Sequence, residues 1–341
     1  MTRTRRTLVA VVGLVSAFTL VAVGAGGAGA QQDDFRMAIV TDIGSLQDKS
    51  FNQLANKGRI EVGKLLDIPT RVYVTNKAED RLPNMLAAAS AGYDLVFGVG
   101  FFHAEHLNTV APRYPRQQFA GIDVTRFLLP ANPRNYTGVV FAEHEAGYLV
   151  GYLAALTAQR QGGRQVISSV GANAVPAIVK FMSGYIQGAK KANPRVTVLS
   201  NYANDPTFSD QAKCKEVALR QIARGSQVVF QVAGGCGLGA LSAAKEKKVW
   251  GIGVDADQGY LGAHMLTSAT KKVDLAVRKI TRRAFNDALQ GQTDFQFNVK
   301  NGGVGYGTVS PIVPKADIAK LNNIRKQIAN GKIKIKETVK F

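Results

Sequence analysis

A polar segment near the start of the chain has the residue types and the position of a ligand site. Residues 36–40 form a short, mostly apolar and partly β-branched run that predicts a buried parallel strand, and Asp42 follows at its carboxyl end. Ligands of open α/β sheets bind at that edge. Asp48 or Ser50 could cap the helix that begins near Phe51, which places an aromatic ring close to the carboxylate. A purely structural role, with Asp48 and Ser50 as caps and Phe51 in the core, is the alternative.

A second aromatic residue, Phe208, has a similar position further along the chain. It follows a turn at Asp205 and lies just ahead of another predicted helix, so its place mirrors that of Phe51. Two rings that face each other from different lobes would enclose a flat aromatic ligand, each contact contributing about 0.5–1.5 kcal/mol beyond its burial. Carboxylates such as Asp42 accept hydrogen bonds only, which favours a ligand rich in donors and disfavours a phosphate.

Strands and helices alternate in the rest of the chain, as in a parallel sheet covered by helices on both faces. A break rich in Pro and Asn at residues 128–136 separates a first set of elements from a second. Past Asp255 the chain is expected to cross back, and the alternating Lys and Ile residues 332–336 predict an edge strand. The predicted lobes are 35–141 with 257–290 for the first, and 142–256 with 291–341 for the second.

The N-terminus has the pattern of an export signal. Three arginines precede an apolar run from Leu8 to Val23, and small residues follow up to Ala30. This predicts a signal peptide over residues 1–30, cleaved near Ala30. No later segment has the ~20 consecutive apolar residues that a membrane span needs. We therefore expect a monomeric, soluble protein of the periplasm.

The basic composition raises the question of an acidic partner. The 341 residues include 43 Lys and Arg against 24 Asp and Glu, a formal net charge of +19. A charge of this size is found in nucleic-acid-binding proteins, but the basic residues are spread over the whole chain, without a basic stripe interleaved with stacking aromatics. We therefore expect no nucleic-acid partner. The habitat of an exported protein, or attraction to anionic envelope components, is the more natural explanation of the charge.

A metal site has little support in the sequence. His103 and His106 lie one helical turn apart, but only Glu105 stands beside them and no cysteine is near. We expect a solvated helix face there, and neither a metal nor a cofactor in the protein.

Five separated motifs run through the chain in the order that one known family shows. They comprise residues 41–52, 141–149, 233–239, 253–258 and 267–271. The series resembles the basic membrane protein family, whose members are solute-binding proteins of ABC importers similar to a purine nucleoside receptor. The resemblance covers essentially the whole mature chain. It implies a type I periplasmic-binding-protein fold, with two doubly wound parallel-sheet lobes and a ligand cleft between them. It also implies an ABC permease of the inner membrane as partner, and no catalysis.

The resemblance implies which residues contact a nucleoside. Phe51 and Phe208 are similar to the two rings that enclose the base. The residues implied to contact the edges of the base are Asp42, Asn52 and Asp123. Those implied to hold the ribose are Asp255 and Lys271, and the backbone of Gly234 is implied to approach the ligand closely. A purine nucleoside is the implied ligand, with riboflavin or a free base as alternatives within the same family.

The segment from Gly235 to Ala240 offers an alternative of another class. It fits the dinucleotide fingerprint G-x-G-x-x-G/A after a predicted strand, and Asp255 ends the next strand about 20 residues on. An NAD-dependent oxidoreductase is therefore the enzyme-class alternative. Against it, an exported protein would meet little NAD, and no partnered catalytic base is evident.

Cys214 and Cys236 are the only cysteines in the chain. An export signal sends them to an oxidising compartment, and both are expected near the carboxyl edge of the second sheet. A disulfide between them is geometrically plausible, and two buried thiols are the alternative.

Overall fold

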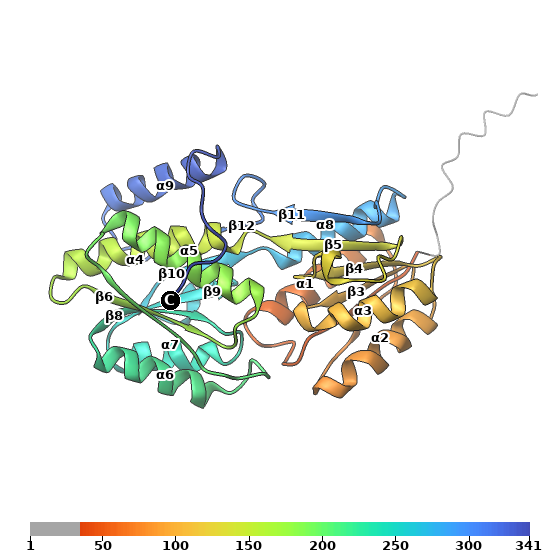
Figure 1. Ribbon diagram of the computed structural model, residues 1–341, viewed down its shortest axis with the longest axis horizontal. Coiled ribbons are helices and arrows are strands. Elements are labelled where there is room, and N and C mark those ends of the chain that lie inside the picture. Colours follow the sequence, from red (N-terminus) through yellow and green to blue (C-terminus); the bar gives the residue numbers. More distant parts are fainter. Residues whose placement is uncertain (1–34) are drawn as a thin grey trace, which may run out of the picture. The chain divides into compact units, whose positions relative to one another are not determined.

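The computed structural model describes residues 35–341, so the predicted signal peptide lies outside the described residues. The first lobe contains two stretches of chain (Figure 1). Its elements are β1 (Met37–Val40), α1 (Phe51–Leu66), β2 (Thr70–Tyr73), α2 (Arg81–Ser90), β3 (Leu95–Val99), α3 (Ala104–Val110), β4 (Gln118–Ile122), β5 (Tyr136–Phe141), α8 (Val273–Phe285) and β11 (Thr293–Phe297).

The second lobe repeats the same plan with helices on both faces of a sheet. Its elements are α4 (Glu143–Gln161), β6 (Val166–Gly171), α5 (Pro176–Ala192), β7 (Thr197–Tyr202), α6 (Gln211–Ala223), β8 (Ser226–Val232), α7 (Gly237–Glu246), β9 (Trp250–Asp255), β10 (Met265–Lys271), β12 (Val304–Tyr306) and α9 (Lys315–Ala329).

Each lobe is built on one six-stranded sheet. The strand orders are β11-β5-β4-β3-β1-β2 and β12-β10-β9-β8-β6-β7. Within residues 35–341 every strand pair is parallel except β10 with β12. All residues of β1 and β3 are buried, as short apolar runs covered on both faces should be. The predicted α/β class and two-lobed fold are confirmed.

The strand pairing corrects the predicted lobe boundaries. Residues 257–290 were expected in the first lobe, but β10 pairs with β9 in the second sheet. Residues 291–341 were expected in the second lobe, but β11 pairs with β5 in the first sheet. Both strands carry an ordinary strand pattern, and that pattern does not specify which sheet a strand joins.

The predicted edge strand at residues 332–336 is also wrong. This segment crosses α5 as irregular chain, where Lys336 exchanges two backbone hydrogen bonds with the Gln187 side chain. Ile333 and Ile335 are half-buried against the core while the lysines are exposed. Extended chain that lies across a helix turns alternate side chains toward the helix, with the same two-residue period as a strand. The alternation of Ile and Lys has this cause here.

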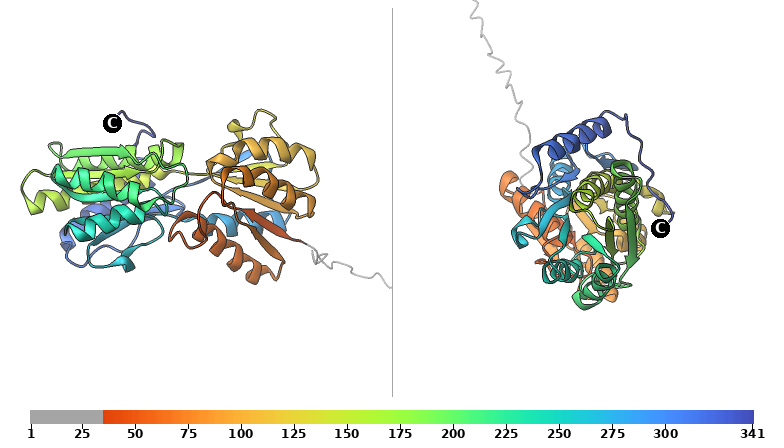
Figure 2. Two further views of the ribbon diagram at one scale, coloured as in Figure 1. Left: turned by 90° about the horizontal axis from the view of Figure 1, so that it is seen from below. Right: turned by 90° about the vertical axis from the view of Figure 1, so that its left-hand side faces the viewer.

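Three connections between the lobes lie close together, and Figure 2 shows the lobes and the segments that join them. The Phe141 ring stacks on Phe297 with 5.2 Å between centroids. The N–H of Ala142 donates to the carbonyl of Phe297 at 2.8 Å, and Lys272 donates to Gly303 at 2.8 Å. Residues at the ends of these connecting segments are therefore held where the two lobes meet.

Glycines let α4 and α5 approach closely. A Cβ added to Gly184 would overlap the carbonyl of His144, and one added to Gly151 would overlap the carbonyl of Tyr185.

We expect Gly184→Ala to lower the free energy of unfolding by about 1–3 kcal/mol, because the helices must move apart. Urea denaturation measures this loss. Gly305→Ala is the control, since its Cβ would meet only the Thr270 hydroxyl at 3.6 Å, and equal effects of both changes would contradict the prediction.

Candidate ligand-binding site

A cavity of about 310 Å³ lies at the carboxyl ends of strands from both sheets. Its size falls within the range of small-molecule pockets. The structure brings every predicted ligand-binding residue to its lining, namely Asp42, Phe51, Asn52, Asp123, Phe208, Gly234, Asp255 and Lys271. Residues separated by up to 229 positions in the chain therefore share one cavity, because parallel strands end at the same edge of each sheet.

The Phe51 loop is organised by the carboxylate of Asp48. This carboxylate accepts hydrogen bonds from the backbone N–H groups of Ser50, Asn52 and Gln53 at 2.9, 2.8 and 3.1 Å. Asp48 is therefore the residue that caps α1, while the Ser50 hydroxyl is directed elsewhere. Phe51 is the first residue of the helix, so the α1 backbone fixes the position of its ring.

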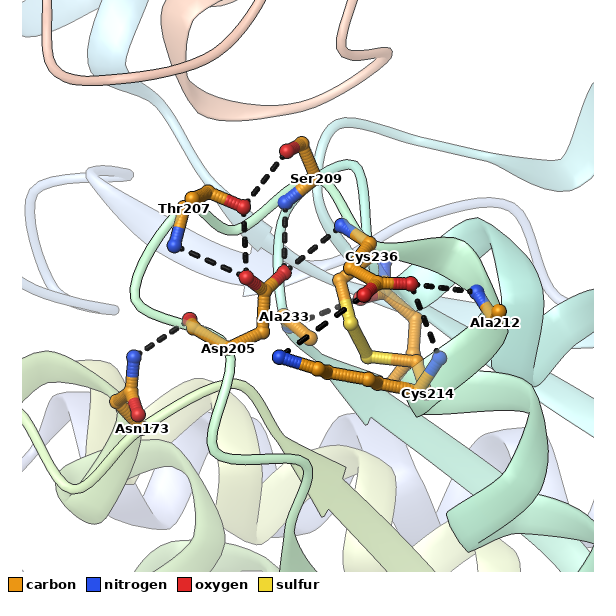
Figure 3. The surroundings of a disulfide bond; sticks show 11 residues. Asn173, Asp205, Thr207, Ser209, Ala212, Cys214, Ala233 and Cys236 are labelled. Atoms are coloured by element: carbon orange, nitrogen blue, oxygen red, sulfur yellow. Dashed lines mark hydrogen bonds and ion pairs between the residues drawn. A yellow bond between two sulfur atoms is a disulfide. The ribbon is translucent and has the colours of Figure 1, made fainter. Parts of the chain in front are cut away.

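The Phe208 loop repeats this arrangement in the second lobe (Figure 3). The carboxylate of Asp205 accepts from the N–H groups of Thr207, Ser209 and Asp210 at 3.0, 2.8 and 2.8 Å. Burial alone would raise the pKa of Asp205, but a hydrogen bond from the Thr207 hydroxyl at 2.6 Å and the backbone hydrogen bonds hold it below its ordinary value. In both loops the bonded residues follow the aspartate by two, four and five positions, and the phenylalanine follows it by three. The two lobes thus present their rings by the same device.

Phe102 is an aromatic lining residue that sequence reasoning missed. Its ring centroid lies 6.3 Å from that of Phe208, which it meets edge to face across the lobes. Between Phe51 and Phe208 no ring contact exists in the described chain, although both line the cavity. The only sequence signal for Phe102 was its place three residues after the apolar run that forms β3.

Asp42 is paired with a buried arginine that sequence reasoning also missed. Nε and Nη2 of Arg81 lie 3.0 and 2.7 Å from Oδ1 of Asp42, and the Ile43 N–H donates to the same oxygen. Oδ2 has no hydrogen-bond partner among residues 35–341. Arg81 therefore neutralises the carboxylate and leaves one of its oxygens as an acceptor. The charged residues Asp80 and Arg81 at the start of α2 were the available sequence signal.

Asn52 provides a second acceptor on this side of the cavity. Its side chain is 3% exposed, and its Oδ1 has no hydrogen-bond partner within the described chain. Its Nδ2 makes only long contacts of 3.4 Å to the carbonyls of Asp42 and Ile43. A buried unpaired acceptor is costly unless a ligand or water donates to it.

Lys271 is the centre of a buried charge cluster. Its Nζ lies 2.6 Å from both carboxylate oxygens of Asp123 and 2.9 Å from Oε1 of Glu143. All three ammonium donors are therefore used. Burial alone would lower the pKa of Lys271, but Asp123, Glu143 and Asp255 together raise it. Burial raises the pKa of Glu143 to about 7 despite the attraction of Lys271.

Asp255 links the two lobes. Its Oδ2 accepts from the Ser50 hydroxyl at 2.5 Å, and nearby the Gln258 side chain donates to the Lys49 carbonyl at 3.1 Å. Burial raises the pKa of Asp255 to about 6, against the attraction of Lys271. The Ser50 hydroxyl is thus free of capping and serves as a contact between the lobes.

Three of the cavity residues other than glycine have a left-handed backbone. The φ angles of Asp123, Phe208 and Asp255 are 64°, 56° and 60°. Each such residue costs on the order of 1–3 kcal/mol, and strained residues of this kind cluster at functional sites. The strain therefore supports a binding role for the cavity.

The fingerprint-like glycines have a packing role. A Cβ on Gly239 would overlap the carbonyl of Gln211, and one on Gly237 would overlap the Gln231 side chain. They allow α7 to lie against α6 and β8. Cys236, which stands between Gly235 and Gly237 in the chain, forms a disulfide with Cys214, with 5.6 Å between the Cα atoms. Of the two alternatives left open for these cysteines, the structure therefore has the bonded one.

His103 does not lie on a solvated helix face as expected. It is fully buried, and its Nε2 is 2.9 Å from the carbonyl oxygen of Thr41. Burial lowers its pKa to about 4, so the ring is neutral and supports the β1 end. Among residues 35–341 no cluster of three or more His, Cys, Asp or Glu side chains has the arrangement of a metal site.

The chain is similar to known proteins over almost all of its described length. A family model described as ABC transporter substrate-binding protein, PnrA-like, matches residues 35–339. The chain belongs to this PnrA-like family. The predicted resemblance to basic membrane proteins is thereby confirmed, and the protein is a substrate-binding component of an ABC transporter.

The PnrA-like protein is similar in sequence to relatives over most of the length of each chain. It is 33% identical over 304 residues to the ABC transporter nucleoside-binding protein BmpA of Lactococcus lactis subsp. cremoris, covering 83% of this chain and 84% of the relative. It is 31% identical to a CD4+ T-cell-stimulating antigen of Listeria monocytogenes, covering 89% and 88%. A solute-binding protein of Aeropyrum pernix has the same fold, with a TM-score of 0.80 at 23% identity, covering 90% and 94%. No helix within residues 35–341 has the length and apolar character to cross a membrane.

The raised pKa of Glu143 predicts a pH-dependent stability. Between about pH 4.5 and 7 the folded protein binds more protons at this residue than the unfolded chain, so the free energy of unfolding should fall as pH rises. From pH 5 to 8 this group should contribute a loss of roughly 1–3 kcal/mol. Urea denaturation of the parent and of Glu143→Gln separates the contribution of Glu143 from that of His103. The lowered pKa of His103 makes the free energy of unfolding rise with pH, which is the opposite direction. Parallel pH profiles of the two proteins would contradict the prediction.

Proposed function

We propose that this PnrA-like protein is exported to the periplasm, captures a purine nucleoside in the cavity between its lobes and delivers it to a membrane permease. The observation that carries the proposal is the pair of aspartate-organised loops, which present Phe51 and Phe208 to one cavity that also holds buried carboxylates. A flat base between the rings and a donor-rich sugar beside the carboxylates match that lining. The name of the Lactococcus relative as nucleoside-binding agrees with the proposal.

The polar groups divide the cavity into two ends. At the base end, Oδ2 of Asp42 and Oδ1 of Asn52 accept hydrogen bonds from ring N–H or amino groups. At the sugar end, Asp255 accepts from ribose hydroxyls. Asp123, which the resemblance places among the base-edge readers, is assigned to this end instead, because Lys271, expected to hold the ribose, bonds both of its carboxylate oxygens. Buried carboxylates repel a phosphate, so nucleosides should be preferred to nucleotides.

A ligand panel tests the proposal. Adenosine, guanosine, inosine, the free bases, riboflavin and NAD are added to the mature protein in thermal-shift and calorimetric assays. A ligand at 100 times its dissociation constant adds about 2.7 kcal/mol of stability, which a melting curve resolves. We expect purine nucleosides to bind most tightly. Binding of riboflavin or free bases alone would refute the nucleoside assignment, and binding of NAD alone would favour the enzyme alternative.

Asp255→Ala should weaken nucleoside binding without unfolding the protein. The change removes a charge-assisted acceptor at a strand end, for which a loss of about 1.5–3 kcal/mol, or ten- to a hundredfold in affinity, is expected. Titration calorimetry measures it. Asp257→Ala is the matched control, because that carboxylate bonds Thr308 and does not line the cavity. Parental affinity of the Asp255→Ala protein would show that the ribose role is wrong.

A further inference from the structure

The Cys214–Cys236 disulfide is one hydrogen bond away from Phe208. Cys214 lies in the first turns of α6, Cys236 lies in the turn between β8 and α7, and both are fully buried (Figure 3). The N–H of Cys236 donates to the carbonyl of Phe208 at 2.8 Å. The cross-link therefore ties α6 to the turn that holds the Phe208 backbone.

The two ring-bearing loops differ in how firmly their helices hold them. Phe51 is the first residue of α1, whereas α6 begins only at Gln211, after Phe208. Phe208 therefore stands in a loop, with a φ of 56° that a bulky side chain rarely adopts. It needs support that Phe51 receives from its helix.

The turn that Cys236 anchors supplies this support. A Cβ on Gly235 would come within 3.2 Å of the Phe208 carbonyl oxygen, and one on Gly234 within 3.5 Å of the Phe208 Cβ. The glycines thus lie directly against the backbone of Phe208. Without the disulfide, the turn and the loop would be held only by hydrogen bonds and packing.

We propose that the disulfide is a positioning element for Phe208, keeping the ring preorganised for its ligand. The proposal rests on the assigned function of Phe208 as one wall of the nucleoside site. A ring already held in the bound position loses less conformational freedom on binding, which increases affinity. Because both sulfurs are buried, replacement of both cysteines by alanine is a cleaner probe than a reducing agent.

Hydrogen exchange of the ligand-free protein provides the first test. In the Cys214→Ala/Cys236→Ala variant we expect faster amide exchange in residues 205–211 and 233–237, with residues 48–53 unchanged as the matched loop of the first lobe. A merely structural disulfide would instead accelerate exchange across the whole second lobe, including β6. Unchanged exchange at 205–211, or a rise spread evenly over that lobe, would overturn the proposal.

A mutant cycle read by calorimetry with guanosine and adenosine provides the second test. Loss of the disulfide should weaken binding about tenfold in the parent and in Phe51→Ala, but less than about twofold in Phe208→Ala, where no ring remains to be positioned. The same factor in all three backgrounds, or no weakening in any, would overturn the proposal. A parent that binds neither nucleoside would refute the proposed function, while the exchange result would still decide the positioning role.

Discussion

Replacing Lys271 with methionine is expected to lower the free energy of unfolding by about 3–5 kcal/mol, because buried carboxylates lose their cation. The ammonium is 2.6 Å from both oxygens of Asp123 and 2.9 Å from Glu143, and it is 1% exposed. Methionine keeps the apolar stem, so the loss reflects the missing charge more than a cavity. No second cation lies in hydrogen-bond contact with these two carboxylates in the described chain.

Urea denaturation at two pH values tests this prediction. The loss should be smaller at pH 5 than at pH 8, because protonation of Glu143 removes part of the uncompensated charge. Adding Glu143→Gln to Lys271→Met should recover part of the stability for the same reason. Lys272→Met is the matched control, since the next side chain is exposed. A Lys271→Met protein as stable as the parent at pH 8 would contradict the prediction that the buried carboxylates depend on this cation.

Removal of either ring of the proposed sandwich is expected to weaken nucleoside binding about ten- to a hundredfold. Phe51 and Phe208 belong to different lobes, so neither can enclose the base until the cleft closes around it. The double mutant should lose less than the sum of the two single losses, since one missing ring already leaves the base half exposed. Calorimetric titration of the parent, both single mutants and the double mutant measures these losses.

The outcome separates a ligand contact from a core residue. If Phe208 only filled the core, its replacement would lower the melting temperature by leaving a cavity, and the affinity of the folded sample would hardly change. Phe127→Ala is the control, because this phenylalanine is 76% exposed and does not line the cavity. Strict additivity of the two single losses would count against a shared sandwich.

Local patterns were sufficient for the ring-bearing loops. Asp42 and Phe51 were predicted from one strand end and one helix start, and Phe208 from its similar place in the second lobe. Strand ends, caps and turns depend on neighbours in sequence, so such positions can be identified without the fold. The same locality explains the misassigned tail, because a two-residue alternation has more than one structural cause.

The partners of these residues came only from the structure. Glu143 reaches Lys271 across 128 positions, Ser50 reaches Asp255 across 205, and Arg81 meets Asp42 across 39. No spacing rule connects such pairs, because charge compensation inside a protein depends on which strand ends and helix starts the topology brings together.

Periodic burial in the sequence was sufficient for the α/β class, and its motifs carried the family resemblance that implied eight of the cavity's lining residues, but not Phe102. Only the tertiary structure shows which sheet β10 and β11 join. It also shows that all three hydrogen-bond donors of the Lys271 ammonium bind carboxylate oxygens. It also showed that Phe208, unlike Phe51, stands outside its helix. These are consequences of long-range packing, in which the lowest free energy is a property of the whole fold and not of any segment.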